Sequence, residues 1–133
     1  MPYHFEFDSA DRILRCRFEG RITDADLREY YQSVEKHVKL TNARAGVLDM
    51  SAVSSFEVSP ETIRELANLP PAISDSSRLR CIIASSPKIF GMARMFELQG
   101  QHTRPNLHVV RAQKEAWAIL GVSNPKFEPV ERE

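Results

Sequence analysis

The sequence lacks the features that mark several large classes of protein. Its 18 basic and 18 acidic side chains balance, so it has no excess positive charge for neutralising nucleic-acid phosphates. Its apolar runs fall well short of the ~20 residues that a membrane helix needs. The opening residues, MPYHFEFD, have neither the basic nor the apolar stretch of a signal peptide. These absences predict a cytoplasmic protein with no nucleic-acid partner and no membrane span.

Residues suited to metal or redox chemistry are also scarce. The two cysteines, Cys16 and Cys81, each lie in an apolar strand pattern, which favours reduced thiols in the core. The four histidines are scattered along the chain, at His4, His37, His102 and His108. This spacing does not resemble a metal-ligand set. Because no complete catalytic motif is present, we expect no metal and no cofactor, and a binding role is favoured over an enzymatic one.

The hydrophobic pattern nevertheless predicts a single well-formed domain. The chain has 133 residues, of which 42% are hydrophobic, which suffices for one core. Alternating or continuous apolar stretches predict five strands, at residues 3–7, 14–18, 45–50, 79–84 and 107–111. Helical spacing and capping residues predict about four helices, near residues 24–42, 60–69, 87–100 and 113–120. A Ser-rich loop is expected to follow the strand at 45–50.

The order of these elements, ββαβαβαβα, predicts an α/β fold with one mixed, mostly parallel five-stranded sheet. The turn at residues 8–11 is short, so the first two strands should form an antiparallel hairpin. Every later pair of strands is separated by a helix, which favours right-handed parallel connections. We expect this domain to span residues 1–122, with a connector at 73–78 and a loosely ordered tail at 123–133.

The carboxyl ends of the parallel strands should gather polar side chains at one edge of the sheet. The candidate ligand-binding residues there are Asp49, Ser51, Ser59, Ser85, Ser86 and Arg111. Two helices should begin at this edge, and helix N-termini attract anions. Ser59 and Ser86 each precede a proline, however, and a Ser-Pro pair is also typical of a simple helix cap. The sequence leaves both interpretations open.

The helix predicted at residues 87–100 carries more apolar side chains than one sheet contact needs. The stripe that should face the sheet contains Ile89, Met92, Ala93 and Phe96. Phe90, Met95 and Leu98 fall outside or beside that stripe. They could form the interface of a homodimer or other homo-oligomer, cover an apolar ligand, or pack against other parts of the monomer.

The segment Val47–Val53 resembles the STAS, or SpoIIAA-like, superfamily of anti-sigma-factor antagonists and anion-transporter domains. Asp49-Met50-Ser51 is similar to the Asp-Leu-Ser that ends a strand in that family. The serine that the family phosphorylates corresponds to Ser59, and Val58 and Pro60 depart from the family pattern. The resemblance implies a STAS-like fold, while the departures predict that Ser59 is not an efficient phosphorylation site.

A closer resemblance is to bacterial STAS/SEC14-type proteins of uncharacterised function. It rests on residues 89–96, IFGMARMF, and 115–121, EAWAILG, and extends over Tyr3–Val122. It implies the fold rather than the function. From the lack of a catalytic motif and the surplus apolar side chains of helix 87–100, we expect a non-enzymatic binding or regulatory module that self-associates and binds a protein partner or small ligand. The alternative is a carrier or enzyme for an anion or an apolar, lipid-like ligand. That alternative would use the strand-end edge around Asp49, Ser51 and Arg111, or an apolar pocket beside helix 87–100.

Overall fold

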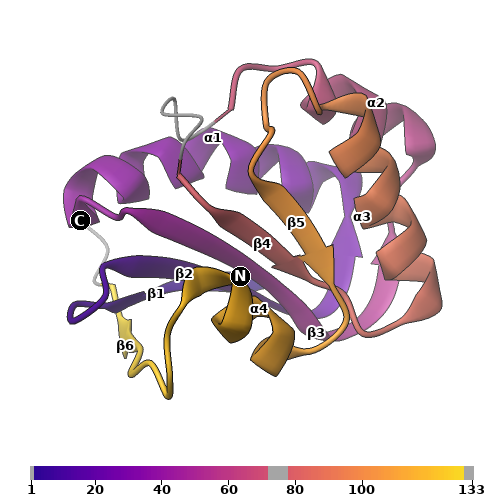
Figure 1. Cartoon of the computed structure of the whole chain (residues 1–133). Coiled ribbons are helices and arrows are strands. Elements are labelled where there is room, and N and C mark those ends of the chain that lie inside the picture. Colours follow the sequence, from indigo (N-terminus) through magenta and orange to yellow (C-terminus); the bar gives the residue numbers. More distant parts are fainter. Residues whose placement is uncertain (1, 72–77, 131–133) are drawn as a thin grey trace.

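The computed structural model of the chain describes residues 2–71 and 78–130. These residues form an α/β domain with one six-stranded sheet and four helices (Figure 1). The strands are β1 (Tyr3–Asp8), β2 (Ile13–Thr23), β3 (Ala45–Glu57), β4 (Arg80–Ile83), β5 (Leu107–Val110) and β6 (Glu128–Pro129). The helices are α1 (Asp24–Thr41), α2 (Pro60–Ala67), α3 (Pro87–Gln99) and α4 (Gln113–Leu120). Residues 73–77 of the predicted connector lie outside the described residues.

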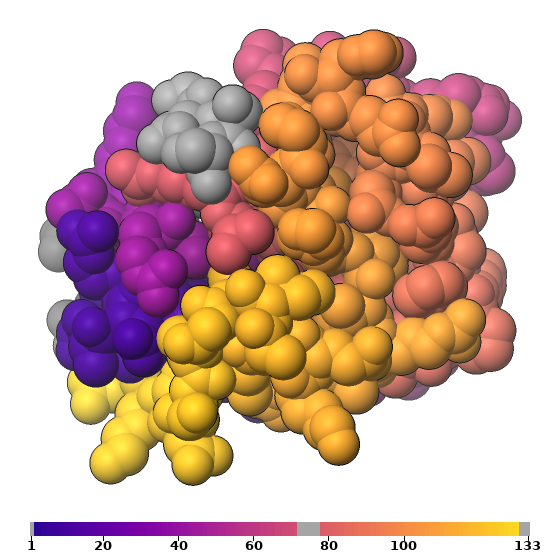
Figure 2. Space-filling view, viewed as in Figure 1, coloured from indigo at the N-terminus to yellow at the C-terminus, as the bar shows by residue number. Residues whose placement is uncertain are grey.

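The strand order is β5-β4-β3-β2-β1-β6. β2, β3, β4 and β5 run parallel, and β1 pairs antiparallel with β2, which confirms the predicted topology. The sheet has six strands rather than five, because Glu128 and Pro129 pair antiparallel with β1. This two-residue strand lies in the segment predicted as a loose tail. Figure 2 shows the C-terminal segment, in yellow, beside the indigo N-terminal strands.

The prediction of a Ser-rich loop after residue 50 is wrong, because β3 continues to Glu57. Its second half pairs with an equally extended β2, and irregularities in the register accommodate the polar stretch. At the far end, Arg21 Nε and Nη2 donate to the Glu57 carboxylate at 2.8 and 2.9 Å. Backbone pairing with β2 and this ion pair therefore stabilise the second half of β3, which has no apolar periodicity in the sequence.

The two faces of the sheet are covered unequally. α1, α2 and α3 pack on one face, over a large core that includes Phe18, Met50 and Ile82. The other face carries a smaller core around Val47 and Ile83, covered by α4 and the chain that follows it (Figure 1). The alternation of side chains along each strand divides the apolar residues between these two cores.

Candidate functional site

Two of the strand-end residues predicted as a ligand site, Asp49 and Ser51, are hydrogen-bonded to each other. Asp49 is buried, and its Oδ1 accepts hydrogen bonds from the Ser51 N–H at 2.9 Å and the Ser51 Oγ at 2.7 Å. Its Oδ2 lies 4.0 Å from Arg17 Nε. Asp49 thus orders the backbone of β3 where the strand becomes polar, a common role for an aspartate next to a serine.

Residues on the neighbouring strand ends also have local roles. The Ser86 Oγ caps α3 by accepting from the Ile89 N–H at 3.2 Å. The Arg111 guanidinium lies 4.0 Å from the centre of the Phe90 ring. Ser85 is exposed beside them. None of the six predicted ligand residues lines either of the two cavities beneath α1.

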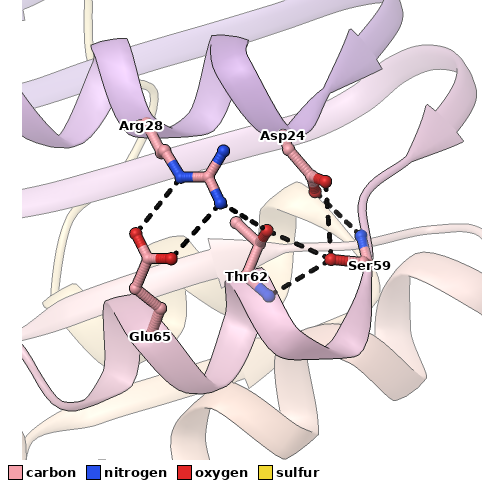
Figure 3. Close-up of polar contacts among 5 residues, drawn as sticks. All are labelled: Asp24, Arg28, Ser59, Thr62 and Glu65. Carbon is pink, nitrogen blue, oxygen red and sulfur yellow. Dashed lines mark hydrogen bonds and ion pairs between the residues drawn. The ribbon is translucent and has the colours of Figure 1, made fainter.

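Ser59 belongs to a polar cluster that joins α1 to α2 (Figure 3). Asp24 accepts from the Ser59 N–H at 2.8 Å and from its Oγ at 3.4 Å, while the Ser59 Oγ accepts from the Thr62 N–H at 3.2 Å. One turn further on, Arg28 donates to the Glu65 carboxylate through Nε at 3.1 Å and Nη2 at 3.2 Å. The bond from the Ser59 backbone is the main reason that the pKa of Asp24 lies below its ordinary value. Ser59 is therefore both a helix cap and part of a joint between helices.

A cavity of about 120 Å³ lies beneath α1, near the opposite edge of the sheet. It is lined near the starts of β3, β4 and β5 by Gly46, Arg80 and Leu107. These three residues are neighbours across the sheet. Its apolar walls include Phe5, Leu14, Val34, Val38 and Phe96. The cavity is also lined by Cys16, Tyr30, Tyr31, Cys81 and Arg104. The cavity is therefore mainly apolar, with two arginines in its wall.

A second cavity of about 70 Å³ adjoins the first. Both are lined by Tyr30, Tyr31, Leu48, Ile82 and Phe96. Its remaining walls come from apolar side chains of α1, α2, α3 and β3, including Leu27, Phe56, Ile63 and Ile89. The two cavities therefore lie next to each other under α1, the first near the starts of the parallel strands and the second nearer their carboxyl ends.

The two arginines in the cavity wall are bound differently. Arg104 is buried and donates to the carbonyl oxygens of Ala67 and Leu69, each at 3.0 Å, and to Tyr31 Oη at 3.1 Å. Arg80 is half-buried, and its Nε and Nη2 are shielded from solvent with no hydrogen-bond partner among the described residues. Burial, followed by the nearby positive charge of Arg104, lowers the pKa of Arg80.

Both cysteine thiols are poor nucleophiles, Cys16 in the core beneath α1 and Cys81 in the smaller core on the other face of the sheet. Cys16 and Cys81 are buried and form no disulfide, as predicted. Burial raises the pKa of Cys81 to about 11 and that of Cys16 still further. Among residues 2–71 and 78–130, no group of three or more His, Cys, Asp or Glu side chains is placed to hold a metal ion. The chemistry that the cavity wall offers is apolar contact and positive charge.

The residues predicted for a subunit interface have different environments. Leu98 is 53% exposed, as expected for a side chain outside the core stripe. Phe90 and Met95 are half-buried and pack against the main core of the monomer. The surplus apolar groups on α3 are therefore shared between the monomer's own core and the surface.

Arg80, Arg104, Tyr30 and Tyr31 are the site residues that sequence reasoning missed. The sequence does contain a signal for Arg80, because this arginine interrupts an otherwise apolar stretch, Leu79–Ala84, that is predicted to be buried. A charged residue in a buried strand requires either a partner or a function. Arg104, in a polar segment after α3, gives no such signal.

Comparison with known proteins adds no family to these observations. No protein-family model matches the chain, and no curated protein matches its sequence. Within the described ranges, no helix has the length and apolar character to cross a membrane. The resemblance to STAS-type proteins accordingly stays a prediction.

Proposed function

We propose that this chain is a non-enzymatic binding module of STAS-like type that takes up a small, mainly apolar molecule in the two cavities beneath α1. The observation that carries the proposal is the pair of adjoining, largely apolar cavities inside a small domain. The proposal includes a cytoplasmic location, as expected from the sequence.

The energetic argument starts from the close packing of protein interiors. At about 24 cal/mol per Å³, the value for a fully enclosed void, the first cavity of about 120 Å³ costs the fold at most about 3 kcal/mol. A ligand that fills it would recover part of this loss through contacts with walls that are already formed. An apolar cavity of about 150 Å³ is known to stay dry and to bind benzene, so a ligand of roughly that size suits this site.

A titration with 1-hexanol tests this proposal. It should raise the melting temperature and shift the NMR signals of groups that line the cavities, including the side chains of Tyr30 and Leu48. Val38→Phe should place a larger side chain in the first cavity and abolish both effects. Val122→Phe is the matched control, since Val122 packs on the opposite face of the sheet and should not affect binding. A wild-type protein that does not respond to 1-hexanol would contradict the proposed function.

Self-association is a second candidate function, and the exposure of Leu98 favours it. A leucine that is 53% exposed on a helix surface can contribute to the symmetric contact of a homodimer. This function is compatible with ligand binding, because Leu98 lines neither cavity.

A further inference from the structure

The wall of the first cavity carries positive charge without a matching acid. Arg80 and Arg104 both line it, and no Asp or Glu is among its lining residues in the part of the chain that the structure describes. A partly buried cation is unfavourable unless it is paired or well hydrogen-bonded. Arg104 meets this requirement through backbone carbonyls and Tyr31. Arg80 does not, since two of its nitrogens have no partner among the described residues.

The two unpaired nitrogens of Arg80 are Nε and Nη2. In two other arginines of this protein, the same two atoms together bind a carboxylate. Arg21 holds Glu57 through Nε and Nη2 at 2.8 and 2.9 Å. Arg28 holds Glu65 through the same two nitrogens, at 3.1 and 3.2 Å. Nε and Nη2 lie along one edge of the planar guanidinium, so two of their N–H bonds are parallel and match the two oxygens of a carboxylate.

The surroundings of Arg80 limit the rest of the ligand. Arg80 lines the first cavity together with Tyr30, Tyr31 and Ile82, which also line the second cavity. A ligand anchored at Arg80 would therefore extend into apolar space. One guanidinium fork in such surroundings suits a single negative charge. A phosphate dianion would require more donors than this wall provides.

We infer that the ligand is an amphipathic carboxylate whose apolar body fills the two cavities. Its carboxylate binds Nε and Nη2 of Arg80 after a small shift of this side chain opens the two nitrogens, which are shielded from solvent in this structure, to the cavity. This inference rests on the proposed function, because it assigns a charge to the molecule that the cavities take up. It identifies the ligand class as small carboxylic acids with a ring or a short alkyl chain.

The experiment compares hexanoate with 1-hexanol, which has the same number of carbons but no charge. Titrations near neutral pH would use isothermal calorimetry, with the melting temperature as a second readout. We expect the wild-type protein to bind hexanoate about tenfold or more tightly than 1-hexanol, as a charge-assisted contact predicts. Arg80→Met should weaken hexanoate binding by about the same factor and leave 1-hexanol binding unchanged or stronger. Arg64→Met, which removes an exposed arginine from α2, is the control and should alter neither.

The outcomes separate the two proposals. If 1-hexanol binds but hexanoate does not bind more tightly, or if Arg80→Met leaves hexanoate affinity unchanged, the carboxylate inference is wrong and the cavity function stands. If neither probe binds, both proposals fail. Tighter binding of hexyl phosphate than of hexanoate would also overturn the choice of carboxylate. Should Arg80→Met fail to fold, Arg80→Lys replaces it, and the loss of the parallel donors should still weaken hexanoate binding severalfold.

Discussion

Replacing Arg104 with methionine should strongly destabilise the fold. Arg104 is only 4% exposed, and it connects three helices. Its Nη1 and Nη2 donate to carbonyls at the C-terminal end of α2 and to Tyr31 on α1. Its guanidinium also lies 4.9 Å from the centre of the Phe96 ring on α3. Methionine keeps most of the apolar stem and removes all of the donors, so the variant isolates the polar contribution.

The magnitude follows from the bonds that are lost. The two shortest, each 3.0 Å long, go to Ala67 and Leu69 at the negative end of the α2 dipole. Hydrogen bonds to a charged group contribute about 1.5–3 kcal/mol each, and losses within one network overlap rather than add. We therefore expect Arg104→Met to lower the free energy of unfolding by about 3 kcal/mol.

Urea unfolding followed by far-UV circular dichroism measures this change. With a slope of about 1.5 kcal/mol per molar urea, the midpoint should fall by about 2 M. Arg64→Met is the control, because Arg64 is exposed and its nitrogen lies 3.6 Å from a Glu61 oxygen. Such surface pairs contribute less than about 1 kcal/mol. A loss below about 0.5 kcal/mol for Arg104→Met would refute the role assigned to these hydrogen bonds.

Four other results are expected. Because the folded-state pKa of Asp24 is lowered, its ionised form stabilises the fold above the unfolded pKa, and this stability disappears as the pH falls below about 4. Urea midpoints of Asp24→Asn should thus depend less on pH between about 5 and 3, and an unchanged dependence would contradict this. Ser59 should not be phosphorylated efficiently by an anti-sigma-type kinase with ATP, because a phosphate on Ser59 would lie next to the negative charge of Asp24. Stoichiometric phosphate on the Ser59 peptide in mass spectra would contradict this. Leu98→Asp should keep the fold and weaken association measured by light scattering, whereas a wild-type monomer at roughly tens of micromolar would exclude self-association. Cys81 should react very slowly with Ellman's reagent near pH 8 and rapidly in urea, because a thiol with a pKa of about 11 is about one thousandth ionised there, and fast labelling of the folded protein would contradict its burial.

Most of the fold could be predicted because its elements have strong local signals. The apolar stretch 79–84 and the Ser-Pro pairs at residues 59–60 and 86–87 define a strand and two helix starts without knowledge of the rest. The second half of β3 could not be found this way, because its serines show no apolar pattern and it depends on pairing with β2. β6 was missed because a two-residue strand is too short to show a period.

The candidate site was predicted less well, for a different reason. Polar residues at strand ends can be recognised in a sequence, so Asp49 and Ser59 were predicted as ligand-binding residues. In the structure, both make hydrogen bonds that stabilise the local backbone. A cavity is a property of how side chains from distant segments fail to fill space. Val34 and Ile82 line the same cavity. Nothing in the pattern around either one indicates how much volume they leave between them.

The pairing of β6 with β1 has a consequence for synthesis on the ribosome. The outer edge of β1 gains its partner only when residues 128 and 129 have emerged, long after β1 itself. At about 5–20 residues per second, the nascent chain carries that edge uncovered for on the order of ten seconds. During this interval His4, Glu6 and Asp8 place polar or charged side chains along one face of the strand, a feature that discourages pairing with other chains. The last strand of the described residues therefore covers an edge that one of the earliest strands presents.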